Sequence, residues 1–205
     1  VIDMGGATTG VAVYEEGDLQ YLGVVPIGGI NITNDLAIGL KTDPEIAEEV
    51  KVKHASAISK GDASGLSLKR DGEIYTFNTE EINEIVEARL EEIFEGVQYH
   101  LKKAGRAGRL PGGVVLVGGG AKLKHITEYA KESLGLAARL GQASGFGGVA
   151  DDIDKLDYAS AIGLMRIDAE QANIPGGKHH APKFKAPSSK EMKGKLSKVF
   201  GWFKP

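Results

Sequence analysis

Two glycine-rich segments, each placed directly after an apolar run, limit the folds open to this 205-residue chain. The first is Asp3-Met4-Gly5-Gly6-Ala7-Thr8-Thr9, between two strand-like runs, and the second is Gly118-Gly119-Gly120, after Val114–Val117. Glycine turns expose bare peptide N–H groups, which suit phosphate oxygens at a strand end or a helix N-terminus. Taken alone, the first segment is better explained as an ordinary turn. The second is explained equally well by close packing of a helix on a sheet.

The rest of the pattern predicts an α/β protein with a mixed sheet flanked by helices. Strands are expected at residues 1–4, 11–14, 19–27, 113–117 and 137–140. Helices are expected at residues 30–40, from 42 with a Thr42–Glu45 capping box, 80–103, 122–134 and 157–167. A hairpin that turns at Asp71-Gly72 is expected within an inserted stretch, residues 55–78.

Composition excludes several kinds of site. The chain has no cysteine, so disulfides, thiolate zinc sites and cysteine nucleophiles are ruled out. The five histidines form no convincing ligand set, so no metal site is predicted beyond a water-mediated Mg²⁺ contact from Asp3. No apolar run approaches the roughly 20 residues of a membrane-spanning helix. Val1-Ile2-Asp3 opens directly on a strand-like run, so we expect a fragment of a longer protein.

The last residues of the chain differ in charge from the rest. Residues 183–205 hold seven lysines against Glu191, whereas the first 182 residues carry a net charge of −9. An acidic body makes nucleic acid an unlikely partner. Within 190–205 one helical face is apolar and its other faces carry lysines, which predicts an interfacial helix on an anionic membrane. The residues expected to bind the membrane are Met192, Leu196, Val199, Phe200, Trp202, Phe203, Lys193, Lys195 and Lys198.

The order of the motifs resembles one family. The segments occur in the order of the second half of the actin-like ATPase fold: the Asp-x-Gly-Gly-x-Thr-Thr hairpin, Gly28-Gly29 with Thr33 and Asp35, Glu48-x-x-Lys51, and the strand into Gly118-Gly119-Gly120. From Val1 to about Asp168 the chain is similar to the FtsA family of bacterial cell-division proteins, and the tail is similar too. The resemblance implies that the chain is the C-terminal portion of such a protein, with ATP and Mg²⁺ as cofactors.

By this resemblance, the hairpin is the second phosphate loop and the triple-glycine segment lies against the adenosine. The helix of Glu48 and Lys51 contacts the ribose and adenine. The implied cofactor-binding residues are Asp3, Gly5, Gly6, Ala7, Thr8, Thr9, Gly28, Gly29, Glu48, Lys51, Gly118, Gly119, Gly120 and Lys122. Ala7 stands where the loop usually has a third glycine, and Gly10 replaces a common aspartate. With the N-terminal half of the active site absent, we expect ATP binding with at most slow hydrolysis.

The resemblance also implies an organisation and partners. The nucleotide-binding subdomain is expected at 1–56 and 112–169, an inserted small α+β subdomain at 57–111, a flexible linker at 170–189 and the amphipathic helix at 190–205. Arg89 is expected to bind the acidic C-terminal peptide of FtsZ, because its planar fork suits carboxylates. The implied protein polymerises and tethers the FtsZ ring to the cytoplasmic face of the membrane at the division septum. The alternatives are an actin-like pilus-assembly protein and a small-molecule kinase of the same superfamily.

Overall fold

The structure is a computed structural model that describes residues 1–59, 61, 64–70, 72–142 and 156–172. The chain divides into two compact units, Val1–Met165 and Arg166–Pro205. The first unit contains both sheets and every helix up to α4. The predicted membrane-binding residues, from Met192 to Phe203, lie outside the described residues.

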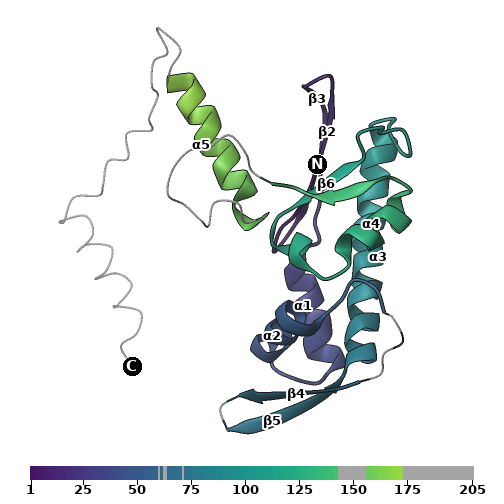
Figure 1. The fold of residues 1–205 in the computed structure, drawn as a ribbon, viewed down its shortest axis with the longest axis vertical. Coiled ribbons are helices and arrows are strands. Elements are labelled where there is room, and N and C mark those ends of the chain that lie inside the picture. Colours follow the sequence, from purple (N-terminus) through teal and green to yellow (C-terminus); the bar gives the residue numbers. More distant parts are fainter. Residues whose placement is uncertain (60, 62–63, 71, 143–155, 173–205) are drawn as a thin grey trace, which may run out of the picture. The chain divides into compact units, whose positions relative to one another are not determined.

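A mixed five-stranded sheet organises the first unit (Figure 1). Its strands are β1 (Ile2–Met4), β2 (Thr9–Glu15), β3 (Asp18–Val25), β6 (Val114–Val117) and β7 (Ala138–Leu140), in the order β3-β2-β1-β6-β7. β1, β2 and β3 form an antiparallel meander, and β6 pairs parallel to both β1 and β7. The parallel β1–β6 pair brings the ends of two strands that are far apart in the sequence to the same edge of the sheet.

Four helices supply most of the core: α1 (Gly29–Gly39), α2 (Pro44–His54), α3 (Thr79–Lys103) and α4 (Ile126–Leu134). The chain also has short 3₁₀ turns η1 (Gly119–Lys122) and η2 (Leu156–Tyr158), and α5 (Ala159–Ala172), which contributes no described residue to this core. α3 buries a stripe of apolar residues and packs against α1, α4, β2 and β3. Asn78 caps α3 by accepting a hydrogen bond from the Glu80 N–H at 2.9 Å.

The inserted hairpin, β4 (Gly65–Arg70) and β5 (Glu73–Asn78), forms a two-stranded sheet of its own at one end of α3 (Figure 1). The predicted subdomain boundary at 57–111 stays a prediction. α3, which falls inside that range, shares its core with α1 and the five-stranded sheet. Among the described residues, the hairpin alone forms a sheet outside the main one.

Two local predictions were wrong, the first because the C-terminal cap of α1 uses Thr42 and the second because a tertiary contact prevailed. The Thr42–Glu45 capping box does not form, since Asp43 is the N-cap of α2 and Pro44 its first residue. The Thr42 N–H instead bonds the Ala37 carbonyl in the final turn of α1. The helix expected at 122–134 begins only at Ile126, because His125 adopts a left-handed φ of 60°.

The residues just before α4 are held out of the helix by the segment that follows α2. The Ala57 N–H donates to the Lys124 carbonyl at 2.8 Å, and the Ser56 Oγ lies 2.9 Å from the His125 Nδ1.

His100, on α3, is also a structural residue, because its Nδ1 lies 2.7 Å from the Tyr21 hydroxyl on β3. No group of three potential metal ligands occurs in the described part of the chain.

Candidate functional site

The loop between β1 and β2 is held in shape by the start of α1. The carbonyls of Gly5 and Gly6 accept hydrogen bonds from the N–H groups of Gly29 and Ile30, at 2.9 and 2.8 Å. Within the loop, the Gly5 N–H bonds the Thr8 carbonyl at 2.9 Å. These contacts use the carbonyl groups of Gly5, Gly6 and Thr8 as acceptors. Of the loop's own N–H groups they use only that of Gly5.

Three consecutive N–H groups of this loop, those of Gly6, Ala7 and Thr8, have no acceptor among the described residues. All three residues are exposed. Successive free peptide N–H groups in a turn form a concave arrangement that binds anions. The loop can therefore bind a phosphate group through the backbone, as the glycine pattern predicts.

Glycine is required where the loop meets its neighbours. A Cβ on Gly28 would lie 2.6 Å from the Gly6 carbonyl oxygen and 2.7 Å from the Thr8 nitrogen. Gly118, with a φ of 86°, would place a Cβ 2.5 Å from Asp3 Oδ1 and 2.6 Å from the Met4 carbonyl oxygen. A Cβ closer than 3 Å to backbone atoms forces the backbone to move. The two glycine-rich segments therefore approach β1 and its loop at distances that only glycine permits.

A cavity of about 410 Å³ lies between the loop, the α1–α2 pair and η1. Its volume falls in the range of small-molecule sites. It brings together eight of the predicted cofactor-binding residues: Gly5, Gly6, Gly29, Glu48, Lys51, Gly119, Gly120 and Lys122. Its other lining residues, which the sequence analysis missed, are Ile30, Ile32, Val52, Leu123 and Asp157. Ile30 and Val52 are 56% and 70% exposed, so two large apolar side chains are open to solvent at this site.

Glu48 and Lys51 form a fixed network at the side of the cavity. The Lys51 Nζ donates to the Gly29 carbonyl at 2.9 Å, the Thr33 Oγ1 at 2.7 Å and the Glu48 Oε2 at 2.6 Å. Partial burial disfavours the charged form of Glu48. The hydrogen bonds from Lys51 and Thr33 outweigh this effect, so the pKa of Glu48 lies below its ordinary value. The network joins α2 to the first turn of α1, which holds the β1–β2 loop.

A second ion pair, Lys122 with Asp157, lies at the η1 side of the cavity. Asp157 belongs to η2, which is also held by a hydrogen bond from the Gly118 N–H to the Leu156 carbonyl at 3.0 Å. Asp157 comes from a part of the chain that carried no motif. Its proximity to Lys122 is a result of tertiary structure alone.

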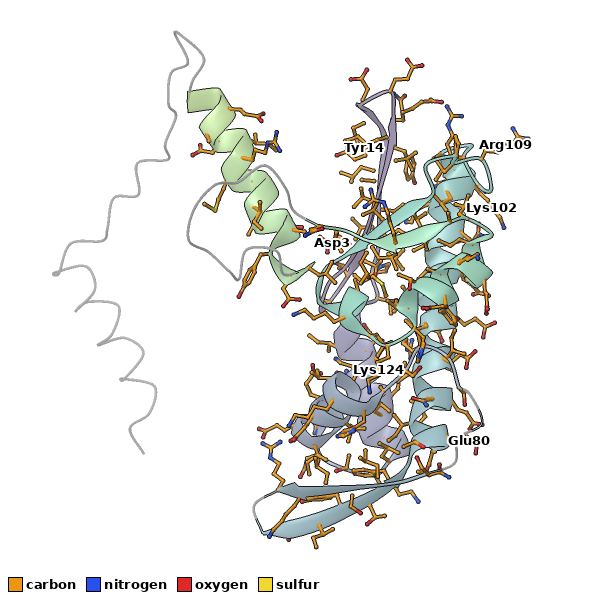
Figure 2. All side chains as sticks on the ribbon, in the orientation of Figure 1. Asp3, Tyr14, Glu80, Lys102, Arg109 and Lys124 are labelled. Atoms are coloured by element: carbon orange, nitrogen blue, oxygen red, sulfur yellow. The ribbon has the colours of Figure 1, made fainter. Side chains whose placement is uncertain are left out.

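The other predicted cofactor-binding residues do not line this cavity. Asp3 faces a separate hollow of about 320 Å³ with Gly10, and its Oδ2 accepts a hydrogen bond from the Ser160 Oγ at 2.5 Å. Thr9 is fully buried and donates to the Ile27 carbonyl at 2.9 Å. Gly28 and Gly118 shape the backbone around the cavity, whereas Ala7 and Thr8 contribute free N–H groups. Figure 2 labels Asp3 beside the strands of the sheet.

Arg89, the residue predicted to bind a peptide, is engaged within the structure. Its Nε and Nη2 donate to the two carboxylate oxygens of Asp35 on α1, at 2.6 and 3.0 Å, and its Nη1 donates to Glu92 at 2.5 Å. The hydrogen bonds that Arg89 donates to the Asp35 carboxylate raise the pKa of Arg89 above its ordinary value. In this conformation Arg89 links α3 to α1, and its predicted contact with an acidic peptide stays a prediction.

The chain matches one family of known proteins. Residues 1–163 match the family model described as "Cell division protein FtsA". The chain is 30% identical over 203 residues to FtsA of Pseudomonas aeruginosa, covering 94% of the chain and 49% of that protein. It is 35% identical over 182 residues to FtsA of Bacillus subtilis, covering 87% and 40%. The chain thus spans about half the length of the curated relatives it matches.

Solved structures show the same fold at lower identity. MreB5 of Spiroplasma citri bound to ADP superposes with a TM-score of 0.63 at 21% identity, covering 84% of this chain and 54% of that one. The PilM–PilN type IV pilus biogenesis complex gives 0.60 at 19% identity, covering 80% and 44%. Among the described helices, none is long and apolar enough to cross a bilayer. The mixed sheet is that of an actin-like α/β subdomain, and the chain belongs to the FtsA family of cell-division proteins.

Proposed function

We propose that the chain forms one wall of an ATP site in an actin-like cell-division protein. The observation that carries this proposal is the cavity of about 410 Å³, with three free N–H groups on the adjoining loop and exposed Ile30 and Val52 on its lining. The N–H groups suit phosphates and the apolar side chains suit a base. Two similar solved structures carry ADP and AMPPNP, which supports the same class of ligand here.

This wall supplies little for a metal ion. Both carboxylates that line the cavity, Glu48 and Asp157, are paired with lysines. Asp3 faces a different hollow, so its predicted water-mediated Mg²⁺ contact stays a prediction. We propose that the chain binds the nucleotide mainly through its backbone and that the rest of a longer protein completes the site. The chain spans about half the length of its curated relatives, and its assignment to the second half of the actin-like fold stays a prediction.

The test of the ATP site is a pair of matched glycine substitutions in the full-length protein. A Cβ on Gly6 would lie 3.8 Å from the Ile30 Cδ1, so Gly6→Val fits the fold but projects methyl groups toward the cavity. Gly65, at the start of β4, meets nothing within 4 Å, so Gly65→Val is the control. We expect the ATP affinity to fall at least about tenfold in Gly6→Val and to be unchanged in Gly65→Val. Equal affinity in both variants, or no ATP binding by the parent protein, contradicts the proposal.

We further propose that the protein polymerises and tethers the FtsZ ring to the cytoplasmic face of the membrane at the septum. Support comes from the family and from the lysine-rich apolar periodicity of residues 190–205. One tail helix binds weakly, but a filament presents many tails, so polymerisation raises avidity without new contacts. Deletion of 190–205 should abolish co-sedimentation with anionic vesicles and leave ATP affinity unchanged. Continued co-sedimentation would contradict the tether.

The predicted contact between Arg89 and the FtsZ peptide requires an exchange of partners. A peptide carboxylate would have to replace Asp35, which already uses the fork of the guanidinium. Arg89→Glu should therefore weaken peptide binding in a titration, and Asp35→Asn should strengthen it if both variants remain folded. Loss of peptide and ATP affinity together in Arg89→Glu would point to a general disruption of α1.

The likeness to the PilM–PilN complex favours a pilus-assembly protein as a second candidate. A pull-down with the FtsZ peptide and with the tail of a pilus membrane protein would separate the two functions. The kinase alternative predicts ATP consumption that depends on a small-molecule substrate, and such an enzyme has no need of a basic amphipathic tail.

A further inference from the structure

The cavity contains two ammonium groups with different hydrogen bonding. An ammonium group has three N–H donors. Lys51 uses all three, on the Gly29 carbonyl, Thr33 and Glu48, and its side chain is only 15% exposed. Lys122 has one partner among the described residues, Asp157, and its side chain is 49% exposed. Of these two cations, Lys122 alone has donors available for an incoming anion.

The Asp157 carboxylate is held weakly, so an incoming anion can displace it from Lys122. Its side chain is 36% exposed, and exposed ion pairs of this type contribute little to stability because water and salt screen both charges. Asp157 also lines the cavity itself, close to the triple-glycine segment, where a Cβ on Gly119 would lie 3.6 Å from its Oδ1. A carboxylate at this position repels the phosphates of any nucleotide in the cavity unless it moves.

We propose that Asp157 is an internal competitor for Lys122. In the nucleotide-free protein Asp157 holds the Lys122 ammonium, and on binding the phosphate groups of the nucleotide take its place. Asp157 thereby lowers the affinity of the site for polyphosphates and sets how strongly it prefers them over an uncharged nucleoside. This inference rests on the proposed ATP-binding function.

The exchange also reaches beyond the cavity. Asp157 lies in η2, which continues directly into α5, and η2 is held to the triple-glycine segment by the Gly118–Leu156 hydrogen bond and the Lys122–Asp157 pair. When phosphate takes Lys122, one of these two contacts is lost. The amides at the η2–α5 junction should then exchange with solvent faster in the nucleotide-bound protein.

The test is a titration of the full-length protein with ATP, ADP and adenosine at low salt. Asp157→Asn keeps the shape of the side chain and removes its charge, so we expect ATP to bind about two- to fivefold more tightly, ADP less so, and adenosine unchanged. Lys122→Gln should weaken ATP binding. Asp18→Asn, which removes the same charge at the start of β3, is the matched control and should change nothing.

A double-substitution cycle separates the specific exchange from a general effect of charge. In a Lys122→Gln background, Asp157→Asn should bring no further gain. An equal gain with and without Lys122, or the same gain from Asp18→Asn, would overturn the inference while ATP binding stands. If the parent protein binds no ATP, the proposed function fails and this inference fails with it.

Discussion

Two of the hairpins in the described part of this chain differ in how glycine shapes them. At the β1–β2 loop, Gly28 and Gly118 lie so close to neighbouring backbone that any Cβ would sit within 2.7 Å of another atom. In the β4–β5 hairpin, Gly65 and Gly72 meet nothing within 4 Å, and Gly72 owes its identity to its own φ of 87°. The first loop is shaped by its neighbours and the second by its own turn. In the first arrangement, neighbouring backbone holds the loop that carries the free N–H groups of Gly6, Ala7 and Thr8.

Burial differs between the same two regions. The five-stranded sheet and its helices bury a continuous core, whereas Leu68, at 8% exposure, is the one described residue of β4 or β5 that is buried. Stability within a protein follows such differences, and poorly buried hairpins open at lower free energy than the core. The following predictions test this contrast, in order of decreasing expected effect.

The largest effect is expected from truncating the core beneath α3. Phe94 is fully buried and packs edge-to-face on Tyr129, with the ring centroids 5.3 Å apart. Phe94→Ala should therefore lower the free energy of unfolding by about 3–5 kcal/mol. Phe77 is half-buried in β5 and stacked on Tyr75, so Phe77→Ala should lower the free energy of unfolding by only about 1–2 kcal/mol. Urea unfolding measures both. Equal losses would mean that the hairpin is as much part of the core as α3.

A smaller effect is expected from adding one methyl group at each type of glycine. Gly28→Ala forces the phosphate loop away from α1 and should cost about 1–3 kcal/mol, because overpacking against backbone is not easily relieved. Gly65→Ala should change the free energy of unfolding by less than about 0.5 kcal/mol. A neutral Gly28→Ala variant that still binds ATP would show that the loop is adaptable.

The ion pairs of the two regions should differ in the same direction. In the pair of Arg89 with Asp35, two guanidinium N–H groups bond the carboxylate, and the side chains are 23% and 27% exposed. Asp35→Asn removes the charge from this pair and should lower the free energy of unfolding by about 1–2 kcal/mol. Glu45→Gln removes a pair between α2 and Arg70 of the hairpin, in which Glu45 is 80% exposed, and should cost less than about 1 kcal/mol. Chemical unfolding in low and moderate salt measures both differences. A larger loss from Glu45→Gln would reverse the comparison.

The smallest effect concerns pH. The pKa of Glu48 is lowered in the folded protein, so its stabilising contribution is complete above its unfolded pKa of about 4.3. That contribution is lost as the pH falls through the lower, folded pKa. The difference in stability between the parent protein and Glu48→Gln should therefore be constant near neutral pH and shrink below about pH 4.3. A difference that grows on acidification would contradict the assigned direction of the shift.

Much of the fold is predictable from local pattern. The apolar period of α3 and its Asn78 cap, the strand meander and the Asp71-Gly72 hairpin all follow from residues close in sequence. The two errors have different causes. Thr42 bonds back to Ala37 in the local C-terminal cap of α1, whereas the residues before α4 are held by the segment that follows α2. Only the second contact joins residues that are distant in the sequence.

The same division holds for the candidate site. Gly5, Gly6, Glu48, Lys51 and the triple-glycine segment were predicted because their motifs occur in a recognisable order, and the structure gathers most of them around one cavity. Val52 and Asp157 carried no motif. Their only sequence signals were an apolar residue beside Lys51 and an acidic residue before a final helix, and both are too common to indicate a site.

The parallel pairing of Ile2 with Leu116 has a consequence for biosynthesis. The partners are separated by more than a hundred residues, so a nascent chain that leaves the ribosome has its phosphate loop long before the opposite wall of the cavity exists. During that interval β1 lacks its parallel partner β6, so one of its edges is unpaired. Nucleotide should therefore be unable to assist the early stages of folding, and should act only once the triple-glycine strand has emerged.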